Sequence, residues 1–146
     1  MYIVSSCLAG INCRYDGGNN LNEKVLELVK AGKAIPVCPE MLGGLETPRL
    51  ESEIVRDESG NRKVVDKEGR DVTTAFIKGA MKTAAIAKIV DAKKAILQQR
   101  SPSCGYGKIY DGTFSGNLIE GNGITTEVLL ENGIEILTVD DLDELD

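Results

Sequence analysis

Short apolar runs alternate with amphipathic segments along this chain, and polar or glycine-rich stretches separate them. The runs at residues 2–4, 34–38, 95–97 and 134–139 are short and continuous, which predicts buried β-strands. Pro36 has no backbone N–H to donate to a neighbouring strand. We therefore expect the strand at 34–38 to lie near an edge of its sheet.

Three other segments carry apolar residues at helical spacing, within 21–29, 72–90 and 126–131. Asn20, with Glu23 three positions later, has the pattern of a helix N-cap and predicts that the first helix starts there. The second segment is the longest, and its inner face is made of unusually small residues. Such a face allows a helix to pack closely on a sheet.

Strands that alternate with helices are typical of an α/β domain with a mostly parallel sheet. The segments 53–56 and 63–66 flank a turn-rich stretch and predict an additional hairpin. We therefore expect a single α/β domain over residues 1–146, with a three-layer, Rossmann-like fold, a mostly parallel sheet and a surface β-hairpin. In such folds, ligands bind outside the carboxyl ends of the strands.

The segment RSPSCGYGKIYDGTFSG, residues 100–116, carries four glycines, one proline and a cysteine. Its turn-forming residues favour a loop over a helix or a core strand. Cys104 lies in this loop, Cys7 and Cys38 lie at the ends of the first two predicted strands, and Cys13 lies in the loop after the first strand. The carboxyl ends of parallel strands meet at one edge of a sheet, so we expect a pocket lined by cysteines.

Charge and composition exclude several functional classes. A formal net charge of −6 argues against a general nucleic-acid or membrane-surface binder. No apolar run of about 18 residues and no signal segment is present, and we expect a cytoplasmic protein. Cysteines in that compartment are more often buried, catalytic or metal-binding than disulfide-bonded. The absence of histidine excludes Ser–His–Asp and Cys–His catalysis and the usual histidine-containing zinc sites.

The wide separation of the cysteines suits some metal sites better than others. The short paired spacings of zinc ribbons are missing, although zinc is still an alternative. Widely spaced thiolates suit an iron–sulfur cluster better. Three cysteines on a four-iron cluster would leave one iron open to substrate, like the open position of a catalytic metal. The spacing alone does not choose between three ligands and four.

Three sequence blocks occur in a fixed order and together cover nearly the whole chain. They are SCLAGINCRYDG at 6–17, VCPE with GGL and PR at 37–49, and SPSCG with YDGTF at 101–114. These blocks resemble the DUF523 family, which includes the thiouracil desulfurases. The resemblance implies a 4Fe–4S cluster held by three cysteines, whose free iron takes sulfur from a thiolated pyrimidine without net redox change. Water then replaces the sulfur, which gives uracil and sulfide.

By this resemblance we assign the cluster to Cys7, Cys38 and Cys104, with one iron open, and leave Cys13 near the substrate as an uncertain fourth. Removal of sulfur by water also requires a group that activates the water. Glu40, two residues beyond a predicted ligand, is the candidate general acid–base, because a partly buried carboxylate beside a cluster can have its pKa tuned for that role. A solvated loop glutamate is the alternative.

Three other residues are candidates for contacts with the substrate or the cluster. Ser101 and Ser103 flank the third predicted ligand and could hydrogen-bond the substrate or a cluster sulfur. We place Ser101 with the catalytic residues and Ser103 with the substrate-binding residues, and turn or helix-cap chemistry is the alternative for both. Tyr15 could stack on a flat base, and the alternative is an ordinary turn closed by Asp16 and Gly17.

We therefore predict an iron–sulfur-dependent, non-redox desulfurase whose partner is a small thiolated base such as 2-thiouracil. Two alternatives stay open. A non-catalytic zinc protein would be colourless, with closed tetrahedral thiolate coordination. A sulfur carrier would form a persulfide on one reactive cysteine and would work without iron.

Overall fold

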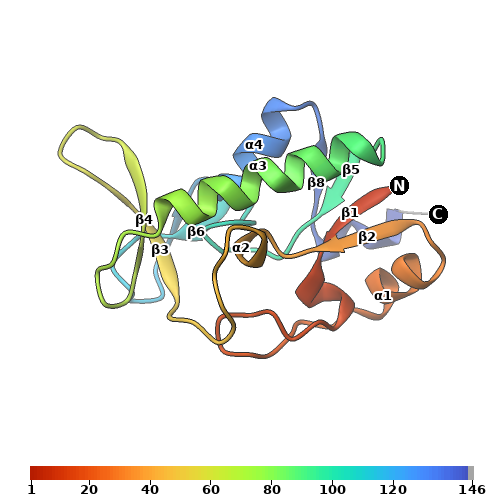
Figure 1. Cartoon of the computed structure of the whole chain (residues 1–146), viewed down its shortest axis with the longest axis horizontal. Helices are drawn as coiled ribbons and strands as arrows, with labels where there is room; N and C mark the ends of the chain where they lie inside the picture. Colours follow the sequence, from red (N-terminus) through yellow and green to blue (C-terminus); the bar gives the residue numbers. More distant parts are fainter. Residues whose placement is uncertain (145–146) are drawn as a thin grey trace.

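The computed structural model describes residues 1–144 and is organised around a parallel sheet with the strand order β2-β1-β5-β8 (Figure 1). The four strands are β1 (Tyr2–Ser5), β2 (Ala34–Val37), β5 (Lys94–Ile96) and β8 (Glu135–Leu137). In the register of the sheet, Ile3 lies between Ile35 of β2 and Ala95 of β5. The expected parallel sheet is confirmed, and the proline-containing strand β2 lies at its edge.

Helices cover both faces of this sheet and give the expected three layers (Figure 1). One face carries α3 (Thr73–Ile89) and α4 (Ile124–Glu131), and the other carries α1 (Glu23–Lys30) with the 3₁₀ helices η1 (Ser6–Ala9) and η2 (Val139–Glu144). Within residues 1–144, no helix combines the length and the apolar character needed to cross a membrane.

Burial on both faces explains the continuous apolar sequence of the strands. Ile3 belongs to the core on the α3 side, whereas its neighbour Val4 belongs to the core on the α1 side, and both are fully buried. Ala95 and Ile96 divide between the two cores in the same way. A strand covered on both faces has no exposed face on which polar residues would alternate.

Helix α1 begins later than Asn20, so the predicted N-cap was wrong. The cap is Asn22, whose side-chain oxygen accepts hydrogen bonds from the backbone N–H groups of Lys24 (3.0 Å) and Val25 (3.2 Å). Asn20 lies in the preceding loop and donates from Nδ2 to Cys7 Sγ at 3.6 Å. Its side chain is therefore used to fix the loop rather than the helix.

Two antiparallel hairpins complete the fold. The first pairs β3 (Ser52–Arg56) with β4 (Arg62–Asp66), and the second pairs β6 (Lys108–Tyr110) with β7 (Leu118–Glu120). The first hairpin was expected, and its turn extends away from the rest of the fold (Figure 1). One of its faces is nevertheless buried, because Ile54 packs with Phe76 of α3 and Ile109 of β6. The second hairpin lies partly within the segment that we expected to be a loop.

Candidate functional site

Three of the four cysteines lie beyond the carboxyl ends of three parallel strands. Cys7 lies in η1, immediately after β1, and Cys38 follows β2 as the N-cap of a short helix, α2 (Pro39–Leu42). Cys104 lies in the loop after β5, and Cys13 lies in the loop after η1. All four are free thiols, and all four line one cavity of about 660 Å³. The structure thus brings together the four cysteines that the sequence predicted to converge.

Cys7 is positioned by the turn that ends η1. Gly10 adopts a left-handed conformation (φ 94°) and its backbone N–H bonds back to the carbonyl oxygen of Cys7 at 3.2 Å. The loop then returns, so that the backbone N–H of Asn20 donates to the same carbonyl at 2.9 Å. Backbone and side chain of Asn20 therefore hold Cys7 from one side.

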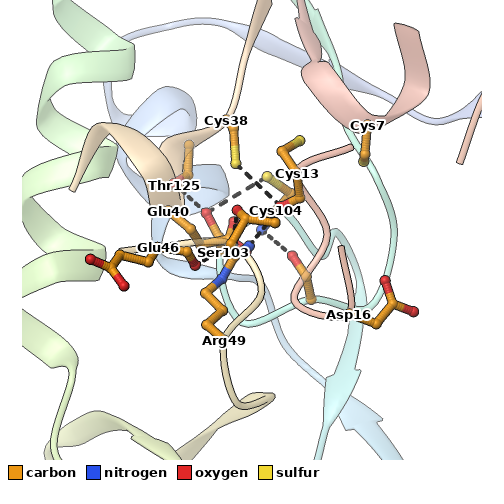
Figure 2. Close-up of polar contacts among 12 residues, drawn as sticks. Cys7, Cys13, Asp16, Cys38, Glu40, Glu46, Arg49, Ser103, Cys104 and Thr125 are labelled. Atoms are coloured by element: carbon orange, nitrogen blue, oxygen red, sulfur yellow. Dashed lines mark hydrogen bonds and ion pairs between the residues drawn. The ribbon is translucent and has the colours of Figure 1, made fainter. Parts of the chain in front are cut away.

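Cys104 is held by hydroxyl groups and by the start of α4. Its backbone N–H donates to Ser101 Oγ at 2.7 Å, and its carbonyl oxygen accepts from Thr126 Oγ1 at 3.0 Å. Behind it, the hydroxyl groups of Ser103 and Thr125 form a buried pair at 2.8 Å, drawn in Figure 2. The first amides of α4 donate to carbonyl groups of this same loop, which fixes the loop on the helix.

Ser101 and Ser103 therefore have different surroundings. Ser101 lines the cavity, and its hydroxyl oxygen also caps the Cys104 turn. Ser103 is only 1% exposed and does not line the cavity. The Cys104 thiol donates to Ser103 Oγ at 3.7 Å, so the structure places Ser103 behind the cysteine and not at the predicted contact with a substrate.

Glu40 is the second residue of α2, and it lines the cavity. Its Oε2 accepts from Arg49 Nη2 at 2.9 Å, and both side chains are largely buried. The same guanidinium nitrogen donates to the carbonyl oxygen of Cys13 at 2.9 Å. Figure 2 shows Arg49 reaching from its own loop toward this group of residues. Arg49 thus connects the carboxylate to the segment that carries Cys13.

Three of the thiols, Cys7, Cys13 and Cys38, shift one another's pKa. The hydrogen bond from Cys13 lowers the pKa of Cys7 to about 7 and also lowers the pKa of Cys38. Hydrogen bonding to Cys38 and then to Cys7 raises the pKa of Cys13 in turn. These contacts favour the ionised form of Cys7 and Cys38 and the protonated form of Cys13. Burial raises the pKa of the Cys104 thiol, which has no such neighbour hydrogen-bonded to it.

Tyr15 also lies in the cavity wall, and the residue is 40% exposed. The guanidinium carbon of Arg14 lies 5.7 Å from the centroid of this ring. Arg14 is itself held by Asp16 at 3.2 Å and by Asn20 at 2.7 Å. The Arg14 guanidinium thus lies over one face of the Tyr15 ring and is held there by Asp16 and Asn20.

The cavity also contains residues that the sequence did not single out for this site. Arg49 stands in one of the sequence blocks, but its sequence context does not indicate that it pairs with Glu40. Glu53, in β3, gave no signal beyond being a charged residue in a predicted strand, yet it is only 6% exposed and lines the cavity. The contacts that give both residues their positions join segments far apart in the chain.

The chemistry of this donor set fits an iron–sulfur cluster. As the side chains stand, no three Cys, His, Asp or Glu groups among residues 1–144 are arranged around a single metal ion. The cysteine ligands of a four-iron cluster bind different iron atoms and need not meet at one point. Four thiols from separate segments, with no histidine in the chain, are the soft donors that such a cluster takes.

Known proteins resemble this chain in both sequence and structure. The family model for 2-thiouracil desulfurase matches residues 2–141. The uncharacterized protein YbbK of Bacillus subtilis (strain 168) is 44% identical over 150 residues, and the match covers 99% of each chain. The solved structure of the [4Fe-4S]-dependent thiouracil desulfidase TudS is 39% identical, with a TM-score of 0.89, and the match covers 99% of this chain and 93% of that one.

Proposed function

This chain belongs to the 2-thiouracil desulfurase family, and we propose that it is a [4Fe–4S]-dependent desulfurase that removes sulfur from a thiolated pyrimidine such as 2-thiouracil. The observation that carries this proposal is the gathering of four free thiols around one cavity at the carboxyl ends of the parallel strands. The likeness to TudS, named for the same cofactor and the same class of substrate, supports it. Four unpaired thiols also favour the reducing cytoplasm as the place of action.

Cys7, Cys38 and Cys104 would hold the cluster, because each follows a different strand of the sheet and reaches the cavity from its own side. Cys13, which lines the same cavity from the loop after η1, would stay unligated beside the substrate. When bound, the cluster would supply a Lewis-acidic iron for the thiocarbonyl sulfur of the base.

The overall reaction is a hydrolysis, in which the thiocarbonyl compound and water give the carbonyl compound and hydrogen sulfide, without net oxidation or reduction. The protein must therefore remove a proton from the attacking water. We assign this role to Glu40, which lines the cavity. Arg49 holds Oε2 of Glu40, and Oε1 has no partner among residues 1–144, so Oε1 is the atom that would take the proton.

Binding of the substrate ring requires an aromatic face on which the ring can stack and a hydrogen-bond donor that orients it. Tyr15 offers an exposed aromatic face for stacking, supported from Arg14. The Ser101 oxygen accepts the backbone N–H of Cys104, which leaves its hydroxyl hydrogen free to be donated to a group in the cavity.

The first test is anaerobic reconstitution with iron and sulfide, followed by iron analysis and an assay of sulfide release from 2-thiouracil. We expect about four iron atoms per chain and turnover in the wild type. Cys7→Ala, Cys38→Ala and Cys104→Ala should each lose both, while the matched variant Cys13→Ala should keep its iron. Tryptic maps or circular dichroism of each variant would show that the fold is retained.

The other outcomes separate the alternatives. Full iron without sulfide release would keep the cofactor and exclude this substrate. Zinc in place of iron, in a colourless protein, would favour the non-catalytic metal site. Sulfide transfer by an iron-free protein, abolished by changing one cysteine alone, would favour a persulfide carrier.

A further inference from the structure

Glu53 is a charged residue at a position where a strand normally carries an apolar one. Its neighbour Ile54 points into the core with Phe76 and Ile109. Successive side chains of a strand point to opposite faces, so Glu53 points away from that core. It is nevertheless only 6% exposed, and it lines the same cavity as the cysteines. A second environment, formed by the cavity and the loop after β6, therefore encloses this carboxylate.

Only one of the two carboxylate oxygens of Glu53 has a protein partner. Oε1 accepts the backbone N–H groups of Gly112 (2.9 Å) and Phe114 (3.2 Å). Across residues 1–144, no donor lies within hydrogen-bond distance of Oε2 and no cationic side chain forms an ion pair with Glu53. No buried, unpartnered side-chain oxygen occurs in this part of the chain either. Oε2 is therefore reached by solvent, and the solvent beside Glu53 is that of the cavity.

The other carboxylates of the cavity wall are either paired or outside the buried region. Glu40 is held by Arg49 at 2.9 Å, and Glu51 by Lys67 at 3.5 Å. Asp140 is exposed. Among residues 1–144, Glu53 is thus the buried carboxylate of the cavity wall that no cation pairs, and two backbone amides fix its orientation.

The chemistry of the proposed substrate matches this acceptor. In 2-thiouracil the thiocarbonyl carbon lies between two ring nitrogens, and each carries one N–H donor. A carboxylate oxygen accepts such a donor in a charge-assisted hydrogen bond, which is stronger than a bond between neutral groups. A ring methylated at that nitrogen has no proton to donate. It would displace the solvent from Oε2 without giving this oxygen a partner, at a cost to binding.

We propose that Glu53 Oε2 accepts a hydrogen bond from a ring N–H of the thiolated pyrimidine, and that Glu53 thereby selects bases with an unsubstituted ring nitrogen. This inference rests on the proposed desulfurase function and adds to it a residue that determines specificity. The other oxygen, Oε1, has a separate role, because it accepts the backbone N–H of Gly112 and so holds that turn in place.

The substitution Glu53→Gln separates the two tasks. The amide oxygen of glutamine accepts the N–H groups of Gly112 and Phe114, as Oε1 does, so the turn is kept. That arrangement places the amide NH₂, a donor, at the position of Oε2. A substrate N–H then meets a donor and not an acceptor. Glu58→Gln is the matched control, since Glu58 lies in the exposed turn of the same hairpin.

The experiment compares kcat/KM for 2-thiouracil, 1-methyl-2-thiouracil and 3-methyl-2-thiouracil in the reconstituted holoenzyme. We expect the wild type and Glu58→Gln to discriminate against one of the methylated rings by roughly 10- to 100-fold. Glu53→Gln should lose a similar factor on 2-thiouracil and should no longer discriminate against that ring. Iron content and thermal unfolding should match those of the wild type.

Two results would overturn the role of Glu53 while the proposed function stands. One is a wild type that turns over both methylated rings as well as 2-thiouracil, which needs no variant and is independent of how Glu53→Gln folds. The other is a Glu53→Gln enzyme that slows equally on all three bases, because a purely structural residue would leave the discrimination intact. A fully loaded wild type that releases no sulfide from any of them would instead overturn the proposed function, and the role of Glu53 with it.

Discussion

At the scale of single residues, the site is supported by polar groups that are fully buried and fully paired. The hydroxyl groups of Ser103 and Thr125 are at most 1% exposed and bond each other at 2.8 Å. The thiol of Cys104 adds a longer contact to the same serine. A buried polar pair of this kind costs little while both partners are present, and much once one of them is removed.

Replacement of Thr125 tests this support. Thr125→Val keeps the shape of the side chain but removes the hydroxyl group that pairs with Ser103. We expect the free energy of unfolding to fall by about 1–3 kcal/mol, because a buried hydroxyl loses its short hydrogen bond. Urea denaturation measures the change. Thr74→Val, at an exposed position of α3, should stay within about 0.5 kcal/mol of the wild type, and equal effects of the two substitutions would contradict the prediction.

Residue type alone pointed to part of the site. The four cysteines could be selected because thiols are few and each followed a predicted strand or lay in an adjoining loop. Glu53 could not be selected, since its partners Gly112 and Phe114 lie about sixty residues away in sequence. The burial of Ser103 could not be predicted for the same reason, because its partner Thr125 belongs to a later helix.

At the scale of elements, the position of α2 depends on a close crossing with α3. A Cβ atom added to Gly43 would lie 1.9 Å from the carbonyl oxygen of Ala75, and one added to Gly79 would lie 1.8 Å from that of Pro39. No side chain fits at either position without moving a helix. Since α2 carries Glu40, this crossing also sets where the candidate general base lies.

Gly79→Ala therefore tests two opposing effects. In an exposed helix the change would stabilise the fold by up to about 1 kcal/mol through helix propensity. Here we expect the clash with Pro39 to outweigh that gain and to lower the free energy of unfolding by about 1–3 kcal/mol. Thermal or urea unfolding decides the sign. Lys78→Ala, one residue earlier and exposed, is the control and should change little, and a more stable Gly79→Ala variant would show that the helices can separate at no cost.

Element length explains which parts of the fold could be predicted. The strands of the parallel sheet have clear apolar patterns because most of their residues are buried, and the long helix α3 has one because it buries one face along its length. Helix α2 and strands β6 and β7 have only three or four residues each, too few for a period to be visible. In β6 only Ile109 is buried, so neighbouring glycines and turn residues dominated the interpretation of that segment.

At the scale of the whole molecule, the sheet and the site have different sources of stability. The strands are held by apolar packing on both faces, and Ile3, Val4, Ala95 and Ile96 are fully buried. The cavity wall consists mainly of loops that follow the strands, held by hydrogen bonds among themselves and to helix ends. A ligand that contacts several of these loops would stabilise them more than it stabilises the sheet, because it binds only when the loops are in their folded positions.

Removal of the cluster should therefore loosen the loops and leave the sheet folded. We expect amide hydrogen exchange, compared between reconstituted and cluster-free protein, to become faster by roughly tenfold or more in residues 7–20, 38–50 and 98–106. Exchange in β1 and α3 should change little, and the hairpin turn at 57–61 serves as an exposed control. A loss of protection that includes β1 would mean that the cluster is needed for the fold itself, as in small metal-dependent domains. Unchanged exchange everywhere would mean that the loops are already fixed by the contacts around Asn20, Arg49 and Ser101.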